Sequence, residues 1–209
     1  MNRSGYLSVL AGFFLMLAAP AGAGPDLERE QRLASEIVDS IIDGDPVRLE
    51  ADGAEFLGIY TETDADKPRG AVLVLHGRGY HPNWPDVVYP VRVGMLEHGW
   101  NTLSIQLPVL GKEATYNDYL PLFEASVTRI NAAIAYLREQ GNDFVVMVAH
   151  SCGTHMANRW IEKTGGGDVS AVVMIGMGAT DRGQPMQDEF HLDKLRVPVL
   201  DIMALNDFP

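Results

Sequence analysis

Short apolar runs are the feature that most constrains the fold of this chain. They are "AVLVLHG" (71–77), "FVVMVAH" (144–150), "SAVVMIGM" (170–177) and "VPVLDIMAL" (197–205). Runs of this length without regular polar alternation are typical of strands that are buried on both faces, as in a parallel sheet. Parallel neighbours need crossover connections, and helical patterns lie between several of these runs. The sequence therefore predicts an α/β fold with a mostly parallel sheet flanked by helices.

Apolar residues at spacings of three and four predict the helices. The strongest pattern runs from Leu120 to Leu137 and follows Asp118, the expected N-cap. Shorter helices are expected over 27–42, 91–97 and 152–164.

A β-hairpin is predicted near the N-terminus. Val47, Leu49 and Ala51 alternate with polar residues, and Asp52-Gly53 is a strong signal for a two-residue turn. "AEFLGIYT" (54–61) is the expected return strand. "WNTLSIQL" (100–107) predicts one further strand of the sheet.

Length and charge limit the classes of protein to consider. The 209 residues favour one domain, and 46% hydrophobic with 21% charged residues is an ordinary globular composition. The formal net charge of −12 argues against nucleic acid as a partner and against docking on anionic lipid, because both carry negative charge.

The first residues predict a secretory signal peptide. Arg3 gives a positive start, "GYLSVLAGFFLMLAA" (5–19) is apolar, and Ala21 and Ala23 form a small-residue cleavage pattern. The alternative is a membrane anchor, but the run is shorter than the roughly 20 residues that a spanning helix needs. We expect cleavage after Ala23, a single domain over 24–209, a periplasmic or secreted location, and no stable membrane insertion.

Cys152 is the only cysteine. An exported protein with one cysteine has no internal disulfide, so burial alone holds the core. A metal site from His150 and His155 lacks an obvious third ligand, so neither a metal nor another cofactor is expected.

A serine lies where an apolar run meets a helical pattern. "AHSCG" (149–153) departs by one residue from G-x-S-x-G, the strand-turn-helix motif that exposes a nucleophilic serine. Ala149 replaces the first glycine, and the helix that begins at Cys152 would direct its N–H groups at a developing oxyanion. The alternative is that Ser151 only caps the helix.

"HGRG" (76–79) follows an earlier buried run. The backbone N–H of Arg78 could pair with that of Cys152 as an oxyanion hole. A dinucleotide-binding loop is excluded because no third glycine is in register and Pro82 breaks an immediate helix. A simple tight turn remains the alternative. The residues expected to shape the site are His76, Gly77, Gly79, His150 and Gly153.

The order of these motifs resembles the α/β-hydrolase superfamily over nearly all of the chain after the leader. Within it, "HGRGYHPNWPDVVYPVRVGMLEHGWNTLSIQLP" is similar to an uncharacterised family of bacterial exported proteins, a domain of unknown function. The resemblance implies an esterase or related acyl hydrolase. It makes Ser151 the nucleophile and Asp207, after the last run, the acid that orients a histidine. Asp181 is the alternative acid, and the short stretch 178–197 implies no large lid.

The resemblance leaves one member of the triad unassigned. α/β-Hydrolases follow the order serine, acid, histidine, and no histidine follows Asp207 here. We expect that the last strand, the last helix and the triad histidine lie beyond residue 209. Each histidine present is a poorer candidate: His76 and His150 shape the loops, His155 is tied to its helix, His98 is remote, His81 lies on a loop, and His191 is the least unsuitable.

Two hypotheses follow. The first is an exported serine hydrolase acting on a small-molecule ester or other acyl substrate. The second is a non-catalytic α/β-hydrolase-fold protein with a binding or envelope-associated role. Neither the substrate nor the oligomeric state can be derived from the sequence.

Overall fold

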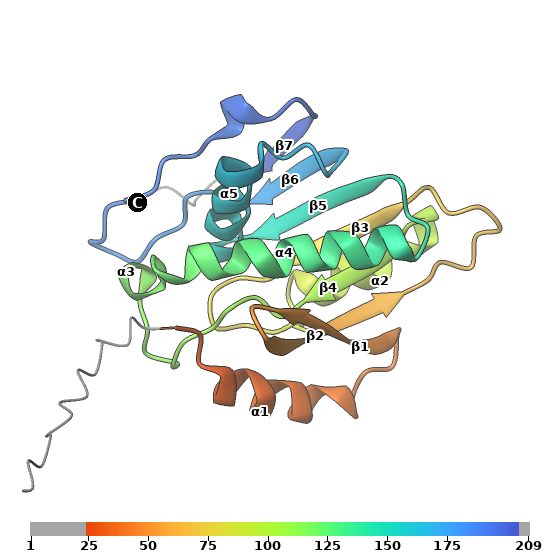
Figure 1. The fold of residues 1–209 in the computed structure, drawn as a ribbon, viewed down its shortest axis with the longest axis horizontal. Helices are drawn as coiled ribbons and strands as arrows, with labels where there is room; N and C mark the ends of the chain where they lie inside the picture. Colours follow the sequence, from red (N-terminus) through yellow and green to blue (C-terminus); the bar gives the residue numbers. More distant parts are fainter. Residues whose placement is uncertain (1–23, 205–209) are drawn as a thin grey trace, which may run out of the picture.

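The computed structural model describes residues 24–204 (Figure 1). The predicted leader and Asp207 therefore lie outside the described residues. The described chain forms a seven-stranded sheet in the order β1-β2-β4-β3-β5-β6-β7. The strands are β1 (Asp45–Ala51), β2 (Ala54–Thr61), β3 (Ala71–Leu75), β4 (Asn101–Ile105), β5 (Val145–His150), β6 (Ala171–Ile175) and β7 (Val199–Ile202). β3 to β7 are parallel, whereas β2 pairs antiparallel with both β1 and β4, which confirms the predicted mostly parallel α/β architecture.

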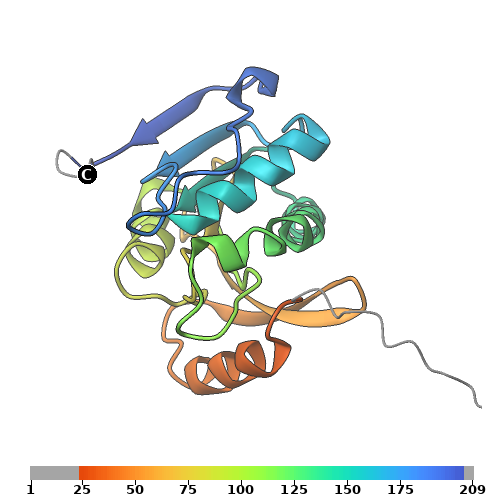
Figure 2. The same cartoon turned by 90° about the vertical axis from the view of Figure 1, so that its left-hand side faces the viewer.

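Helices cover both faces of this sheet. They are α1 (Leu27–Val38), α2 (Val88–Gly94), α3 (Tyr116–Tyr119), α4 (Leu122–Glu139) and α5 (Cys152–Thr164), with 3₁₀ turns at Leu96–His98 and Leu192–Lys194. Figures 1 and 2 show α4 and α5 over one face and α2 over the other. The smaller core beneath α2 joins Val88 to Val72, Val74 and Val148.

The predicted hairpin forms at its predicted turn. Asp52 and Gly53 have φ angles of 52° and 75°, and Ala51 pairs with Ala54 across them. Two consecutive positive φ angles match the right-handed twist of the strands they join, which is why Asp-Gly is favoured there.

The start of the long helix differs from the prediction. Asp118 is not its N-cap. It is the third residue of the separate short helix α3, where its carboxylate accepts from Thr115 N and completes a capping box with Thr115. Pro121 then separates α3 from α4. The capping box satisfies the backbone N–H groups of a helix that begins one turn earlier than the apolar periodicity indicated.

Two other helices also have different bounds from those predicted. The helix expected over 27–42 ends at Val38, and that expected over 91–97 occupies Val88–Gly94. Gly99, with φ 77°, ends the following 3₁₀ turn. Helix ends depend on local caps that periodicity alone does not encode.

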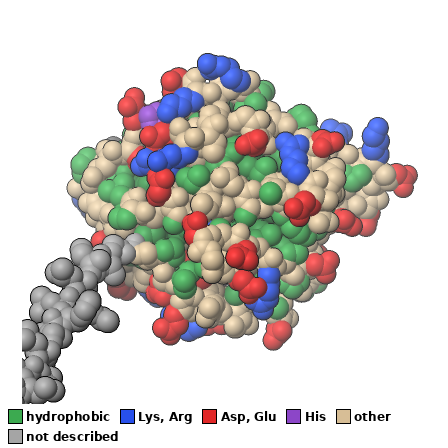
Figure 3. Space-filling view, in the orientation of Figure 1, with side chains coloured by type: hydrophobic (Ala, Val, Ile, Leu, Met, Phe, Trp, Pro, Cys, Tyr) green, Lys and Arg blue, Asp and Glu red, His purple; other side chains and the backbone are tan. Residues whose placement is uncertain are grey.

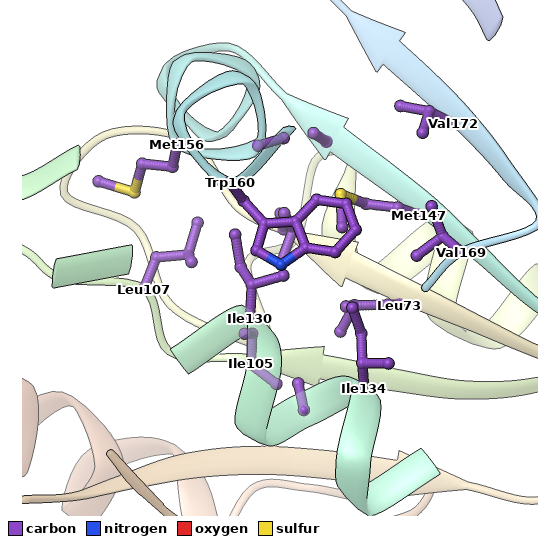
Figure 4. Packing of buried hydrophobic residues seen from close by; sticks show 14 of the residues in the cluster. Leu73, Ile105, Leu107, Ile130, Ile134, Met147, Met156, Trp160, Val169 and Val172 are labelled. Carbon is purple, nitrogen blue, oxygen red and sulfur yellow. The ribbon is translucent and has the colours of Figure 1, made fainter. Parts of the chain in front are cut away.

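Trp160 holds α5 against α4 and the sheet (Figure 4). Its side chain is fully buried and packs within a cluster that includes Ile130 and Ile134 of α4 and Met147 of β5. The indole N–H donates to Asn131 Oδ1 at 2.7 Å, so its polar atom is satisfied. This packing places the N-terminus of α5, which follows Ser151, at the carboxyl edge of the sheet.

β7 is an open edge of the described sheet. It pairs with β6 on one side, and Leu200 and Ile202 remain 54% and 44% exposed. On the face of residues 24–204 seen in Figure 3, acidic and basic side chains are interspersed and form no broad basic patch. No helix within residues 24–204 has the length and apolar character that crossing a membrane requires.

Candidate active site

Ser151 occupies a strained corner between β5 and α5. Its φ and ψ are 51° and −123°, and within residues 24–204 only Asp52 is another non-glycine residue with positive φ. The backbone is held there because Ser151 N donates to Ile175 O at 2.8 Å. Such strain persists only where the surrounding structure enforces it, and it is common at catalytic residues.

The Ser151 side chain does not cap α5. In the described structure its hydroxyl makes no capping hydrogen bond, and the Thr154 side chain instead donates to Ser151 O at 2.6 Å. Ser151 is thus the N-cap residue of α5 by position, but its side chain does not make the capping hydrogen bond that the alternative interpretation expected. The half-buried hydroxyl is left available at the carboxyl ends of the parallel strands, where α/β proteins bind ligands.

Gly153 is required by close backbone approach. A Cβ at this position would lie 2.5 Å from His76 O and 3.0 Å from Leu75 O. The first turn of α5 thus lies against the end of β3, where the "HGRG" loop begins. This contact explains the glycine two positions after Ser151 and brings the two sequence motifs together.

Two backbone N–H groups in these two adjoining motifs are uncommitted in the described residues. Among residues 24–204, no hydrogen bond uses the backbone N–H of Arg78 or of Cys152. Cys152 N lies at the N-terminus of α5, where the helix dipole favours negative charge. The Cys152 thiol is buried, and burial raises its pKa to about 12, so it is not a nucleophile at neutral pH.

His76 anchors the loop of residues 77–80, which we call the oxyanion loop after its predicted role. It is buried, and its Nδ1 lies 2.7 Å from Gly77 O, while Nε2 accepts from Leu107 N at 2.9 Å. This pattern assigns the proton to Nδ1. Burial lowers the pKa of His76 to about 3, so the ring is neutral and ties the loop to the end of β4.

The pH dependence of stability provides a test of this role. The ordinary pKa is 6.5, so below pH 6.5 the unfolded chain binds a proton that the folded protein excludes. The free energy of unfolding should therefore decrease by up to about 1.4 kcal/mol for each unit by which the pH is lowered from 6.5 to about 3. Urea unfolding at pH 7 and pH 5 measures this slope. His76→Asn should flatten it and exposed His98→Gln should not; equal slopes in wild type and His76→Asn would contradict the assignment.

Arg78 and Asp181 form an ion pair across the site. Arg78 donates from Nη1 and Nη2 to both carboxylate oxygens, the second at 2.6 Å, and Tyr116 N donates to the same carboxylate at 2.6 Å. The Arg78 hydrogen bonds hold the pKa of Asp181 below its usual range. Asp181, the alternative acid, is thus paired with an arginine, and in the described residues it is hydrogen-bonded to no histidine.

His155 is sequestered beneath the site. It is fully buried, its Nδ1 lies 2.8 Å from Asp188 Oδ2, and its Nε2 lies 3.0 Å from Ala179 O. Phe123 stacks on the ring at 5.5 Å between centroids. Both nitrogens are engaged, so His155 is not placed to serve Ser151. No sequence pattern pointed to its partner Asp188, which lies in an irregular loop.

The other histidines are not bonded to Ser151 either. His81 Nδ1 accepts from Asn83 N at 3.2 Å, and His191 lies 3.9 Å from Glu162. His150 Nδ1 is buried without a hydrogen-bond partner in the described structure, and burial lowers the pKa of His150. His98 lies in the 3₁₀ turn before β4, at the amino-terminal ends of the parallel strands, whereas Ser151 lies at their carboxyl ends. Within residues 24–204, therefore, no histidine is hydrogen-bonded to Ser151.

The surroundings of the site are partly aromatic. Tyr80 stacks on Trp84 at 3.9 Å between centroids, and the ring of His150 lies 6.4 Å from Tyr80 and nearly parallel to it. A groove of about 870 Å³ lies elsewhere, between α1 and the β1–β2 hairpin, and Ser151 does not line it. No group of three or more His, Cys, Asp or Glu side chains within residues 24–204 is arranged to hold a metal ion.

Comparisons with solved structures agree with this fold. The chain is similar to a novel cold-adapted esterase from an Arctic intertidal metagenomic library in its polyethylene-glycol-bound complex, with 17% identity, a TM-score of 0.58, and coverage of 76% of this chain and 70% of that one. A putative α/β hydrolase from Agrobacterium tumefaciens matches with 13% identity and a TM-score of 0.54, over 76% and 69% of the two chains.

A third match extends over a larger share of the other protein's chain. An α/β serine hydrolase homologue from Coxiella burnetii matches with 13% identity and a TM-score of 0.54, over 78% of this chain and 88% of that one. At such identities the likeness shows the fold alone. The search of curated proteins finds no match.

A sequence family accounts for nearly the whole chain. The family described as "Protein of unknown function (DUF3530)" matches residues 16–126 and 112–208. The chain therefore belongs to this family, and its fold is that of the α/β hydrolases.

Proposed function

We propose that this protein is an exported serine hydrolase that cleaves an ester or another acyl bond of a small molecule. The observation that carries the proposal is the backbone of Ser151, held at φ 51° between β5 and α5 with its hydroxyl free of any cap. Strand-turn-helix geometry of this kind presents a serine oxygen for attack. The esterases among its structural neighbours support the same reaction class.

Ser151 Oγ attacks the acyl carbonyl carbon in the proposed reaction. The carbonyl oxygen becomes an oxyanion that accepts from the backbone N–H groups of Arg78 and Cys152. A histidine takes the serine proton and returns it to the leaving alcohol, and water then hydrolyses the acyl-enzyme by the same route. Asp207 would orient that histidine, which we place outside residues 24–204.

A serine-directed probe tests this proposal. The native protein should be labelled by an alkyl fluorophosphonate, and mass spectrometry of the digest should place the label on Ser151. Ser151→Ala should remain unlabelled, whereas Ser170→Ala, which changes the serine just before β6, should be labelled at the wild-type rate. A wild-type protein that resists the probe would exclude the hydrolase proposal and favour the non-catalytic binding role.

Export has its own test. The mature protein, recovered from the periplasm or medium of its source, should begin at Gly24, since Ala21 and Ala23 form the cleavage pattern. N-terminal sequencing and the intact mass check this and also show whether a segment with a histidine follows residue 209. Retention of Met1 in the cell fraction would contradict export.

A further inference from the structure

The Arg78–Asp181 ion pair joins three elements around the candidate site. Arg78 lies in the oxyanion loop after β3, and Asp181 follows β6. Tyr116, whose backbone N–H also donates to Asp181, is the first residue of α3. The side chains of Arg78 and Asp181 are 32% and 30% exposed, which places the ion pair at the surface of the site rather than in the core. Surface ion pairs add little to stability, so its bidentate geometry suggests a different role.

The segment that carries Asp181 is itself fixed by hydrogen bonds to Tyr116. The buried Tyr116 donates its hydroxyl to Asp188 Oδ1 at 2.6 Å and accepts from Gln187 N at 2.8 Å. The 181–188 segment is thereby attached to α3 at both ends, and through Asp188 it is bonded to His155 of α5. The carboxylate of Asp181 is therefore a stationary anchor for a side chain that reaches it from another loop.

The oxyanion loop needs such an anchor. Gly79 has a φ of 70°, and glycines leave a loop conformationally free. His76 holds the start of the loop, and Gly79 O accepts from Arg29 Nη2 at 3.3 Å, a long hydrogen bond. Between these points, the Arg78 side chain makes the shortest contacts of the loop with the rest of the protein.

We propose that the Arg78 side chain and Asp181 are positioning residues, because their ion pair holds the Arg78 backbone N–H in place as an oxyanion donor beside Ser151. This inference rests on the proposed hydrolase function. It separates two roles of one residue: the backbone N–H contacts the oxyanion, and the guanidinium fixes that N–H. Any non-proline substitution keeps the N–H, so changing the side chain isolates the positioning role.

The competing explanation is that Arg78 binds an anionic group of the substrate directly. Both terminal nitrogens already donate to Asp181, which neutralises the guanidinium charge. Direct recognition would make Arg78→Met raise the KM of an anionic ester and leave a neutral ester unaffected. Positioning would lower kcat for both esters by the same factor and change each KM less than about twofold.

The first experiment needs no activity. Hydrogen exchange followed by mass spectrometry should show that the peptide containing residues 77–80 exchanges about tenfold faster in Arg78→Met and in Asp181→Asn than in wild type. The peptide that contains 156–164 of α5 should be unchanged. Matched controls are Arg48→Met and Glu55→Gln, which break the exposed Arg48–Glu55 pair of the hairpin. Unchanged exchange at 77–80 would overturn the inference.

The second experiment measures the chemical step. Arg78→Met and Asp181→Asn should each slow fluorophosphonate labelling of Ser151 about tenfold, with the melting temperature within about 2 °C of wild type. The double variant should be no slower than either single variant, because both remove one interaction, and Arg78→Lys should be intermediate. Faster exchange with an unaltered labelling rate, or additive losses, would overturn the catalytic part. If the wild-type protein resists the probe, but residues 77–80 still exchange faster in the two variants, the hydrolase proposal is refuted. The inference that the ion pair holds the loop in place would then remain supported.

Discussion

Ser151→Ala is expected to lower ester hydrolysis by about six orders of magnitude, since removal of a serine nucleophile has that effect in serine hydrolases. The serine oxygen forms the acyl-enzyme bond, and the thiol of the neighbouring Cys152 is not suited to replace it, because it is buried with a raised pKa. The measurement is the turnover of short-chain p-nitrophenyl esters by the native protein and the variant. Retention of more than about a hundredth of the wild-type rate would contradict Ser151 as the nucleophile.

The stability of Ser151 variants is a control on the same geometry. Alanine keeps the unfavourable φ of 51°, so Ser151→Ala should unfold at a similar denaturant concentration to wild type. Glycine tolerates that angle, and relief of strain should make Ser151→Gly more stable than Ser151→Ala by about 1 kcal/mol. If glycine is the less stable variant, the corner is not strained.

His155→Leu is expected to destabilise the protein by about 3 kcal/mol or more. The substitution leaves the Asp188 carboxylate without its main partner in a site where His155 is fully buried and the Asp188 side chain is 9% exposed. Burial opposes the charged form of Asp188, but hydrogen bonds from His155 and Tyr116 outweigh it and hold the pKa of Asp188 below its usual value. Removal of one member of a buried pair costs more than removal of both. Urea unfolding monitored by circular dichroism measures the loss.

The double variant His155→Leu/Asp188→Asn is the matched control. Asparagine keeps an acceptor for the Tyr116 hydroxyl but carries no charge, so the double variant should recover part of the stability that His155→Leu loses. A further loss in the double variant, equal to the sum of the single effects, would show that the two side chains are not energetically coupled. That result would also remove the support that Asp188 gives to the 181–188 segment.

The sequence was a good guide to the strands. Each of the four apolar runs contains a strand of the sheet, and Asp52-Gly53 forms the hairpin turn, because burial on two faces and positive φ are local requirements that leave local residue patterns. The helix limits were predicted less well. The capping box at Thr115 and the proline at Pro121 produce two helices, α3 and α4, where the apolar periodicity predicted one. Both signals depend on single residues and not on a repeating pattern.

The candidate site divides in the same way. The sequence by itself determined the strained serine corner, since "AHSCG" needs small residues where β5 and α5 approach the end of β3, and Gly153 meets His76 O there. Only the tertiary structure decided which partners Arg78, Asp181 and His155 have. Arg78 and Asp181 are 103 positions apart, and His155 and Asp188 are 33 apart. A charged or aromatic side chain in a loop is compatible with many partners, and only the packing of the whole sheet and its helices selects one.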